Sequence, residues 1–155
     1  MSAATVCLLC PPEVETSHGH SKPVAVSDHW AVTTFPGFEM PGWFFLQSVS
    51  HATSLDELSN EALLDMGRRL ADAIAAIRRG LGCDKVYVFR FGEGHQHWHT
   101  LLCGLPDSVS GDSRGARYFL DRELFRDEEL ASSVADKVRL ELGHWRRSDI
   151  ALERF

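Results

Sequence analysis

The sequence lacks three features that would place it in other classes of protein. No apolar run approaches the roughly 20 residues that a helix needs to span a membrane. The chain is not basic: its formal net charge is −6, whereas non-specific binding of DNA or RNA needs a broad basic surface. The first eleven residues contain no lysine or arginine and do not predict a signal peptide. We therefore expect a cytoplasmic protein whose partners are neither membranes nor nucleic acid polymers.

Cysteine is also scarce. Four are present, and only Cys7 and Cys10 lie close together. In a reducing compartment such a pair more often binds a metal or acts in redox chemistry than forms a structural disulfide. A lone C-x-x-C is a weak signal, so a redox pair and two ordinary buried thiols stay open as alternatives. Cys83 and Cys103 are expected to be small buried hydrophobes.

What the sequence does contain is enough for one domain over residues 1–155 with a substantial core, because 44% of the residues are hydrophobic and 25% are charged. A capping box, Ser54 to Glu57, predicts the start of a long helix whose apolar residues recur every three or four positions as far as Ile77. A second helix is expected over residues 127–142. The predicted strands are 23–27, 30–34, 43–47, 85–91 and 95–104. This order predicts an α+β protein with helices packed on an antiparallel sheet.

The segment 94–102 contains three histidines at alternate positions: His95, His97 and His99. Side chains alternate between the faces of a strand, so all three imidazoles are expected on the same face. That arrangement suits a core poorly, because each ring nitrogen would need a partner. It suits a phosphate site, because imidazole titrates near neutrality and can attack phosphorus. A surface tract or a loose metal-binding cluster are the alternatives.

His-x-His-x-His followed by two apolar residues resembles the motif of the histidine triad (HIT) superfamily, and the order of elements around it agrees. The resemblance implies a HIT-like antiparallel sheet with a long helix after the third or fourth strand and a C-terminal helix. It implies a nucleotidyl hydrolase or transferase acting on a nucleotide phosphoanhydride or phosphoramidate. His97 would be the nucleophile that forms a covalent nucleotidyl-histidine, and His99 would contact phosphate and help the leaving group. A homodimer paired through the long helix and a neighbouring strand is also implied.

A zinc-containing branch of the superfamily, like the related galactose-1-phosphate uridylyltransferases, carries a cysteine pair near its start. In that branch the histidine before the long helix and the first histidine of the triad complete the site. The resemblance therefore implies a structural Zn²⁺ held by four residues of this chain: Cys7, Cys10, His51 and His95. His18 and His20 are rival ligands because they follow the cysteines closely.

The chain departs from the family where the substrate would bind. Phe35 stands near the position of an acid that holds the ribose, and Glu39 is a candidate substitute from the same loop. The loop before the triad is short, so Glu93 and Gly94 are expected beside the phosphate. Phe35, Phe38, Trp43 and Phe44 are candidates to stack on a base, with core packing as the alternative. A HIT-fold enzyme with a pathway-specific small-molecule substrate, or a non-catalytic protein that binds zinc or nucleotide, is therefore also considered.

Overall fold

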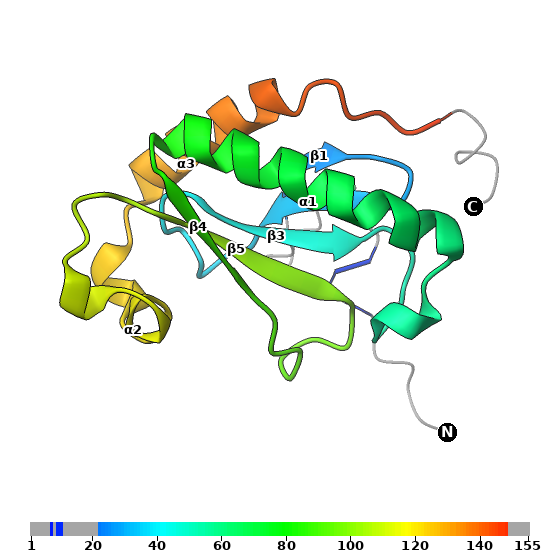
Figure 1. Ribbon diagram of the computed structural model, residues 1–155, viewed down its shortest axis with the longest axis horizontal. Helices are drawn as coiled ribbons and strands as arrows, with labels where there is room; N and C mark the ends of the chain where they lie inside the picture. Colours follow the sequence, from blue (N-terminus) through cyan, green and yellow to red (C-terminus); the bar gives the residue numbers. More distant parts are fainter. Residues whose placement is uncertain (1–6, 8, 11–21, 149–155) are drawn as a thin grey trace.

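The computed structural model describes residues 7, 9–10 and 22–148, and it contains five strands and three α-helices within them (Figure 1). In chain order the elements are β1 (Lys22–Val26), β2 (Trp30–Thr34), β3 (Trp43–Ser48), α1 (Asn60–Leu81), β4 (Lys85–Phe89), β5 (His99–Leu105), α2 (Ala116–Leu120) and α3 (Glu128–Glu141). The strands form one sheet in the order β1-β2-β3-β5-β4, and all neighbours are antiparallel. The predicted α+β class is confirmed.

The strand with the histidines starts later than predicted. Its first residue is His99, four positions after His95. The residue before it, Trp98, is hydrogen-bonded to the end of β3 and to the loop that follows. Its N–H donates to the Ala52 carbonyl at 2.6 Å, and its carbonyl accepts from the Ser48 N–H at 3.1 Å. Side-chain alternation along a strand therefore does not govern His95 and His97.

The start of the long helix also differs from the prediction. The predicted capping box forms only in part: the Glu57 carboxylate accepts from the backbone N–H of Thr53 at 2.6 Å, whereas the Ser54 side chain makes no capping hydrogen bond. The turn that follows is a single turn of 3₁₀ helix, over Leu55–Glu57. Helix α1 itself begins at Asn60, where the Ser59 hydroxyl accepts from the Ala62 N–H. A 3₁₀ turn and one side-chain cap, at Ser59, thus separate β3 from the helix.

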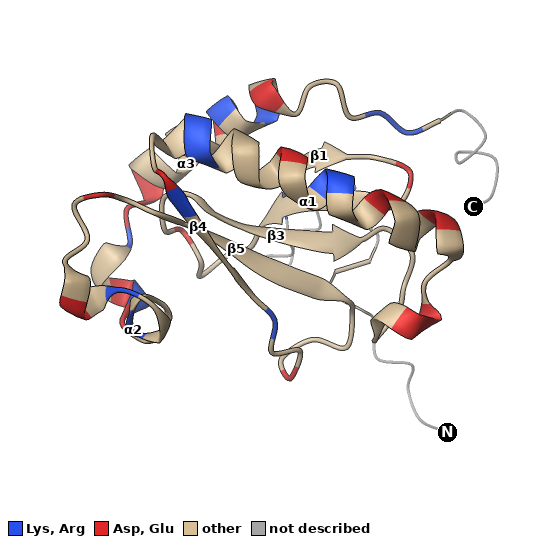
Figure 2. Ribbon diagram, in the orientation of Figure 1, with Lys and Arg blue, Asp and Glu red and all other residues tan. Residues whose placement is uncertain are grey.

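One face of the sheet is covered by α1 and α3, which lie side by side (Figure 1). The core beneath them contains Trp30, Leu46, Leu102 and Ile77, all fully buried. Gly104 of β5 lets the helix approach closely, because a Cβ there would lie 2.7 Å from Leu81 Cδ2. Along these helices acidic and basic residues are mixed, with no broad area of one sign in this view (Figure 2).

The opposite face is aromatic. Trp43 and Phe45 of β3 pack here with Tyr118 of α2, and Trp43 stacks on Phe119 with ring centroids 6.0 Å apart. Trp43 is only 3% exposed, although it lines a cavity between the β2–β3 loop and α3. Phe44 points into the helix-covered core. Both residues pack in the core, the alternative weighed for them, and the substrate contact expected of Trp43 stays a prediction.

Candidate metal centre and histidine site

Four ligand-bearing side chains meet at the end of the sheet where β5 begins: Cys7, Cys10, His51 and His97. Their Sγ and ring nitrogen atoms all lie within 4.8 Å of one another. His97 Nδ1 lies 3.4 Å from Cys7 Sγ and 2.9 Å from Cys10 Sγ, and His51 Nδ1 lies 3.6 Å from Cys10 Sγ. A tetrahedral zinc ion with Zn–S and Zn–N bonds of about 2.3 and 2.0 Å keeps its ligand atoms roughly 3.5 Å apart. The donor set and its spacing fit a structural zinc ion.

The second nitrogen of His97 supports this assignment. His97 Nε2 lies 2.7 Å from the backbone carbonyl of Ser48 and donates to it, which leaves Nδ1 without a proton and with its lone pair toward the thiols. The ring is 1% exposed, and burial lowers the pKa of His97, which favours the neutral form that binds metal. A backbone carbonyl as the outer partner of a ligating imidazole is a common arrangement in zinc sites.

The cysteine segment is held against the sheet by a side chain of β3. Gln47 is fully buried, and its Nε2 donates to the backbone carbonyl of Leu9 at 2.8 Å. The other end of the amide accepts from the Thr33 hydroxyl at 3.0 Å, which fixes its orientation. Leu9 is itself 2% exposed. The sheet therefore presents Cys7 and Cys10 to the histidines through both an apolar contact and a hydrogen bond.

Two of the roles expected for the histidines are corrected by these contacts. His95, predicted to be the fourth zinc ligand, lies outside the cluster, and His97 occupies that place. His97, predicted to be the nucleophile, has one ring nitrogen on the cysteine sulfurs and the other on a carbonyl. The motif fits all three histidines only with His95 in the first place, whereas the structure puts His97 at the metal, which moves the third place of the motif to Leu101. The rival ligands His18 and His20 lie outside the described residues.

His99, two residues further along, has a different environment. Its Nδ1 donates to the backbone carbonyl of His97 at 2.7 Å, so the remaining ring nitrogen, Nε2, carries the lone pair. Within the described part of the chain no hydrogen bond to that Nε2 is found. Burial lowers the pKa of His99, and the hydrogen bond to His97 acts against this. A half-buried neutral imidazole with a fixed tautomer is a competent nucleophile.

Aromatic rings surround this imidazole on the same face of the sheet. Phe45 of β3 lies edge-on to His99 at 5.4 Å between centroids. Phe35 packs on Phe45 at 5.9 Å and on His95 at 5.3 Å, and His95 lies 6.3 Å from His99. Phe35, Phe45, His99 and His95 thus form a closed circuit of rings. The ring of Phe35 is engaged in this packing.

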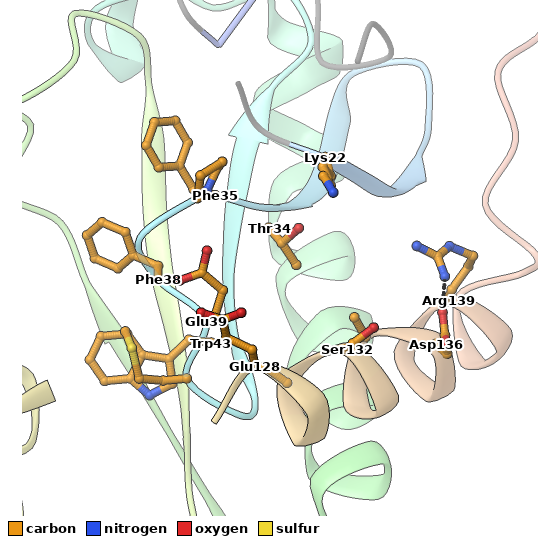
Figure 3. A pocket seen from close by; sticks show the side chains of 14 residues that line it. Lys22, Thr34, Phe35, Phe38, Glu39, Trp43, Glu128, Ser132, Asp136 and Arg139 are labelled. Carbon is orange, nitrogen blue, oxygen red and sulfur yellow. Dashed lines mark hydrogen bonds and ion pairs between the residues drawn. The ribbon is translucent and has the colours of Figure 1, made fainter. Parts of the chain in front are cut away.

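The acid proposed to replace the missing ribose ligand is engaged elsewhere. Glu39 Oε1 accepts from the Gly37 N–H at 2.9 Å, and Glu39 Oε2 pairs with Arg126 at 2.9 Å. Glu39 lines a cavity of about 480 Å³ between the β2–β3 loop and α3. Figure 3 shows the rings of Phe35 and Phe38 on the side of this loop that faces away from α3. None of His95, His97 and His99 lines the cavity, but Phe35, which packs on His95, does.

The loop between β4 and β5 carries the other predicted substrate contacts. Glu93 and Gly94 are exposed in it, and Gly92 has a positive φ of 84°. Arg90 at the base of the loop donates to the Thr53 carbonyl at 2.9 Å and lies over the ring of Trp98. Trp98 is buried edge-on against Trp30, while Gln96 is exposed, which accounts for its polarity. The roles of Glu93 and Gly94 at the substrate stay predictions.

Comparison with known proteins identifies the fold. No family model and no curated protein sequence matches the chain. Among solved structures it is similar to a uridylyltransferase mutant (19% identity, 89% of this chain and 47% of that chain, TM-score 0.63). It is also similar to a hypothetical histidine triad nucleotide-binding protein from Sulfolobus tokodaii (14%, 89% and 91%, 0.60) and a zinc-bound histidine triad family protein from Mycobacterium smegmatis (15%, 79% and 84%, 0.55). The chain spans about half the length of the uridylyltransferase.

The fold is therefore that of the histidine triad proteins. The chain's four-residue Cys/His cluster has the donor set of a structural zinc site. The described residues include no helix long and apolar enough to cross a membrane.

Proposed function

We propose that the protein is a nucleotidyl hydrolase or transferase that acts on a phosphoanhydride or phosphoramidate bond through a covalent histidine intermediate, with His99 as the nucleophile. One observation carries the proposal: the His97 carbonyl holds the Nδ1–H of His99, which leaves the lone pair on Nε2. The same backbone group belongs to a residue of the metal cluster. The metal cluster and the proposed nucleophile are therefore linked by a single hydrogen bond.

The reaction would proceed in two displacements. His99 Nε2 attacks the α-phosphorus, a P–N bond forms, and the bond from phosphorus to the leaving oxygen or nitrogen breaks as that atom gains a proton. Water or another acceptor then attacks the same phosphorus, the P–N bond breaks, and a nucleoside monophosphate or its ester is released. Zinc, when bound, supplies structure only: it would crosslink the N-terminal segment to the strand that carries the nucleophile.

The charge around His99 supports a phosphate substrate. Arg90 lies near enough to contribute to the lowered pKa of His99, so a fixed positive charge faces this end of the sheet. The backbone N–H groups of the β4–β5 loop are additional candidate donors for developing negative charge. We propose that Gly94 contributes in this way. Glu93 would oppose an anion if it turned toward the site, so we propose that it instead helps to select the leaving group.

A second candidate is favoured by one observation. Phe35 occupies the place expected for the ribose acid, and Glu39 is held by Gly37 and Arg126. A nucleoside would therefore have to be recognised without that acid. This favours a HIT-fold enzyme that uses the same histidine on a different, pathway-specific phosphate ester, or a protein that binds zinc and nucleotide without turnover.

Mass spectrometry separates these functions. Zinc-loaded protein purified without a metal-binding tag is incubated with adenosine phosphoramidate, diadenosine polyphosphates and nucleoside diphosphate sugars. The proposal expects release of a nucleoside monophosphate and a nucleotidyl adduct on His99. An adduct on another residue would overturn the assignment of the nucleophile. Folded, zinc-loaded protein that gives neither product nor adduct would overturn nucleotidyl transfer for these substrates.

We also propose, from the same resemblance, a homodimer paired through α1 and a neighbouring strand, located in the cytoplasm. Helix α1 leaves Leu64 86% exposed, and β4 is an edge strand with Val88 47% exposed. All four cysteines lie among the described residues and none is in a disulfide, as a reducing compartment requires. Light scattering tests the dimer: the wild type should give twice the mass of the chain, and Leu64→Glu should give the monomer.

A further inference from the structure

Gln47 is a fully buried polar residue in the middle of the sheet. Side chains alternate along β3, so it lies on the same face as Trp43 and Phe45. A primary amide among aromatic rings is costly unless both its donor and its acceptor have partners. Its two partners lie on different segments: Thr33 of β2 donates to Oε1, and Nε2 donates to the backbone carbonyl of Leu9. The amide therefore joins the sheet to the segment that carries the two cysteines.

Leu9 lies in a tight turn between the two thiols. The Cys10 N–H donates to the Cys7 carbonyl at 3.2 Å, which closes the turn. The Leu9 side chain is buried and its carbonyl accepts from Gln47, so this one residue attaches the turn to the sheet through both of its groups. None of these atoms is a ligand atom of the metal cluster. The attachment can therefore form without a metal ion.

Ordering the turn in advance raises the affinity for metal. Fixing the backbone of one residue costs about 1–2 kcal/mol of conformational entropy. An unattached segment loses that freedom when its thiols bind the ion, whereas an attached turn has already lost it on folding. Since the Leu9 carbonyl is held between the two cysteines, the attachment acts on both thiols at once.

We propose that Gln47 is a positioning residue for the metal: it holds the cysteine turn against the sheet, and Thr33 fixes the amide in the orientation that does so. The proposal rests on the metal cluster and is independent of the proposed reaction. Zinc affinity therefore tests it without any substrate.

Two buried threonines of the sheet provide a matched pair of variants. The hydroxyl of Thr33 donates to Gln47 at 3.0 Å, and the hydroxyl of Thr100 donates to the Phe89 carbonyl at 2.8 Å. The first bond orients the amide that holds the cysteine turn, whereas the second joins β5 to β4. Thr33→Val and Thr100→Val each remove one such bond at nearly constant volume. Gln47→Met removes the amide itself, since methionine is of similar length but cannot donate.

Zinc affinity of the wild type and the three variants is measured on full-length protein without a metal-binding tag, by competition with a chelator of known affinity. Urea denaturation of the zinc-free proteins and absorption spectra of the Co²⁺-loaded proteins are recorded on the same preparations. The first reports general stability, and the second reports the ligands that hold the metal.

We expect Gln47→Met to weaken zinc binding at least tenfold, which corresponds to about 1.4 kcal/mol, because the turn must then be ordered when the metal binds. Thr33→Val should weaken it by a smaller factor. Thr100→Val should lower the unfolding free energy of the zinc-free protein about as much as Thr33→Val and leave the zinc affinity unchanged. The thiolate bands of the Co²⁺ spectra should be the same in all four proteins, because the ligands are the same.

Zinc binding by Gln47→Met that equals that of the wild type would overturn the role of Gln47. An equal loss of zinc affinity in Thr33→Val and Thr100→Val would also overturn it, because general loss of stability would then account for the effect. A wild type that binds no zinc would overturn it together with the metal cluster. If Gln47→Met does not fold, the comparison of the two threonine variants decides alone.

Discussion

The core on the face of the sheet beneath α1 and α3 is mostly aliphatic, with three tryptophans and Phe44, whereas the opposite face is packed mainly with phenylalanine, tyrosine and tryptophan rings. The first face is covered along its length by two helices. The second is covered in part by α2 and its neighbours and ends in two partly exposed imidazoles, His95 and His99. The comparison suggests that the helix-covered face supplies stability and that chemistry is located where the cover of the aromatic face ends.

The two faces meet at the metal cluster. His97 is buried and uses both ring nitrogens, while His99, two residues later, is half-buried and uses one. Histidine thus has a structural role at position 97 and a proposed catalytic role at position 99. Substitutions on either side of this boundary should separate stability from activity.

Removal of the metal should have the largest effect. A zinc ion in the cluster would join Cys7 and Cys10 to His97, just before β5. The binding energy of a structural zinc is also folding energy, about 10 kcal/mol or more in small zinc peptides. We expect Cys10→Ser, or exhaustive chelation, to lower the melting temperature strongly and to reduce nucleotidyl transfer with it. Scanning calorimetry with elemental analysis of the same samples checks this. A zinc-free protein with an unchanged melting temperature would contradict a structural metal.

His99→Ala should come next and should affect activity alone. Loss of the nucleophile removes the covalent route, so we expect turnover to fall by a factor of about 1,000 or more. Zinc content and melting temperature should stay near the wild-type values, because His99 is outside the cluster. Single-turnover kinetics and thermal unfolding on the same preparation provide both readouts. Full activity in this variant would show that another residue is the nucleophile.

Ile77→Ala tests the helix-covered face. Ile77 is fully buried between α1 and the sheet, so the change should leave a cavity and cost about 2–5 kcal/mol of unfolding free energy, while Ile77→Val should cost about 0.5–1.5 kcal/mol. Urea denaturation measures both. KM should not change, because the residue lies on the other side of the sheet from His99. A large change in KM without a change in the unfolding free energy would contradict the claim that the helix-covered face supplies stability and not substrate binding.

Tyr118→Phe should give the smallest effect and tests the aromatic face. The Tyr118 hydroxyl donates to the Gly104 carbonyl at 3.1 Å, so its loss should cost about 1 kcal/mol.

Burial also raises the pKa of Tyr118 from 10.0 to about 12, which favours the neutral phenol in the folded state. The contribution of the Tyr118 phenol to the unfolding free energy is therefore fully present below pH 10 and is lost as the pH rises through about 12. Unfolding free energies of both proteins between pH 9 and 12 should converge. Parallel curves would show that the phenol is not shielded.

The fold could be predicted because its signals are local. Apolar residues at helical spacing identified α1, and aromatic or β-branched runs bounded by turn residues located the strands to within a few residues. Cys83 and Cys103 are buried, as expected for small hydrophobes. The start of β5 was missed because it depends on hydrogen bonds from Trp98 to the loop after β3, which no local pattern contains.

The metal cluster was predicted in three of its four ligands. Cys7, Cys10 and His51 have distinct sequence positions, whereas the fourth had to be chosen from equally spaced histidines. Which histidine becomes the fourth ligand depends on how the backbone just before β5 is held against the rest of the protein, and that is a property of the tertiary structure. The engagement of Glu39 with Arg126, far along the chain, was equally beyond sequence patterns.

The central claim is that His97 belongs to the metal and His99 to the substrate. The most direct measurement is the zinc-to-protein ratio of His95→Gln and His97→Gln, purified side by side with the wild type and without a metal-binding tag. We predict about one zinc per chain in the wild type and in His95→Gln, and a marked loss in His97→Gln. A His95→Gln protein that loses zinc while His97→Gln retains it would contradict the assignment and return the nucleophile to His97.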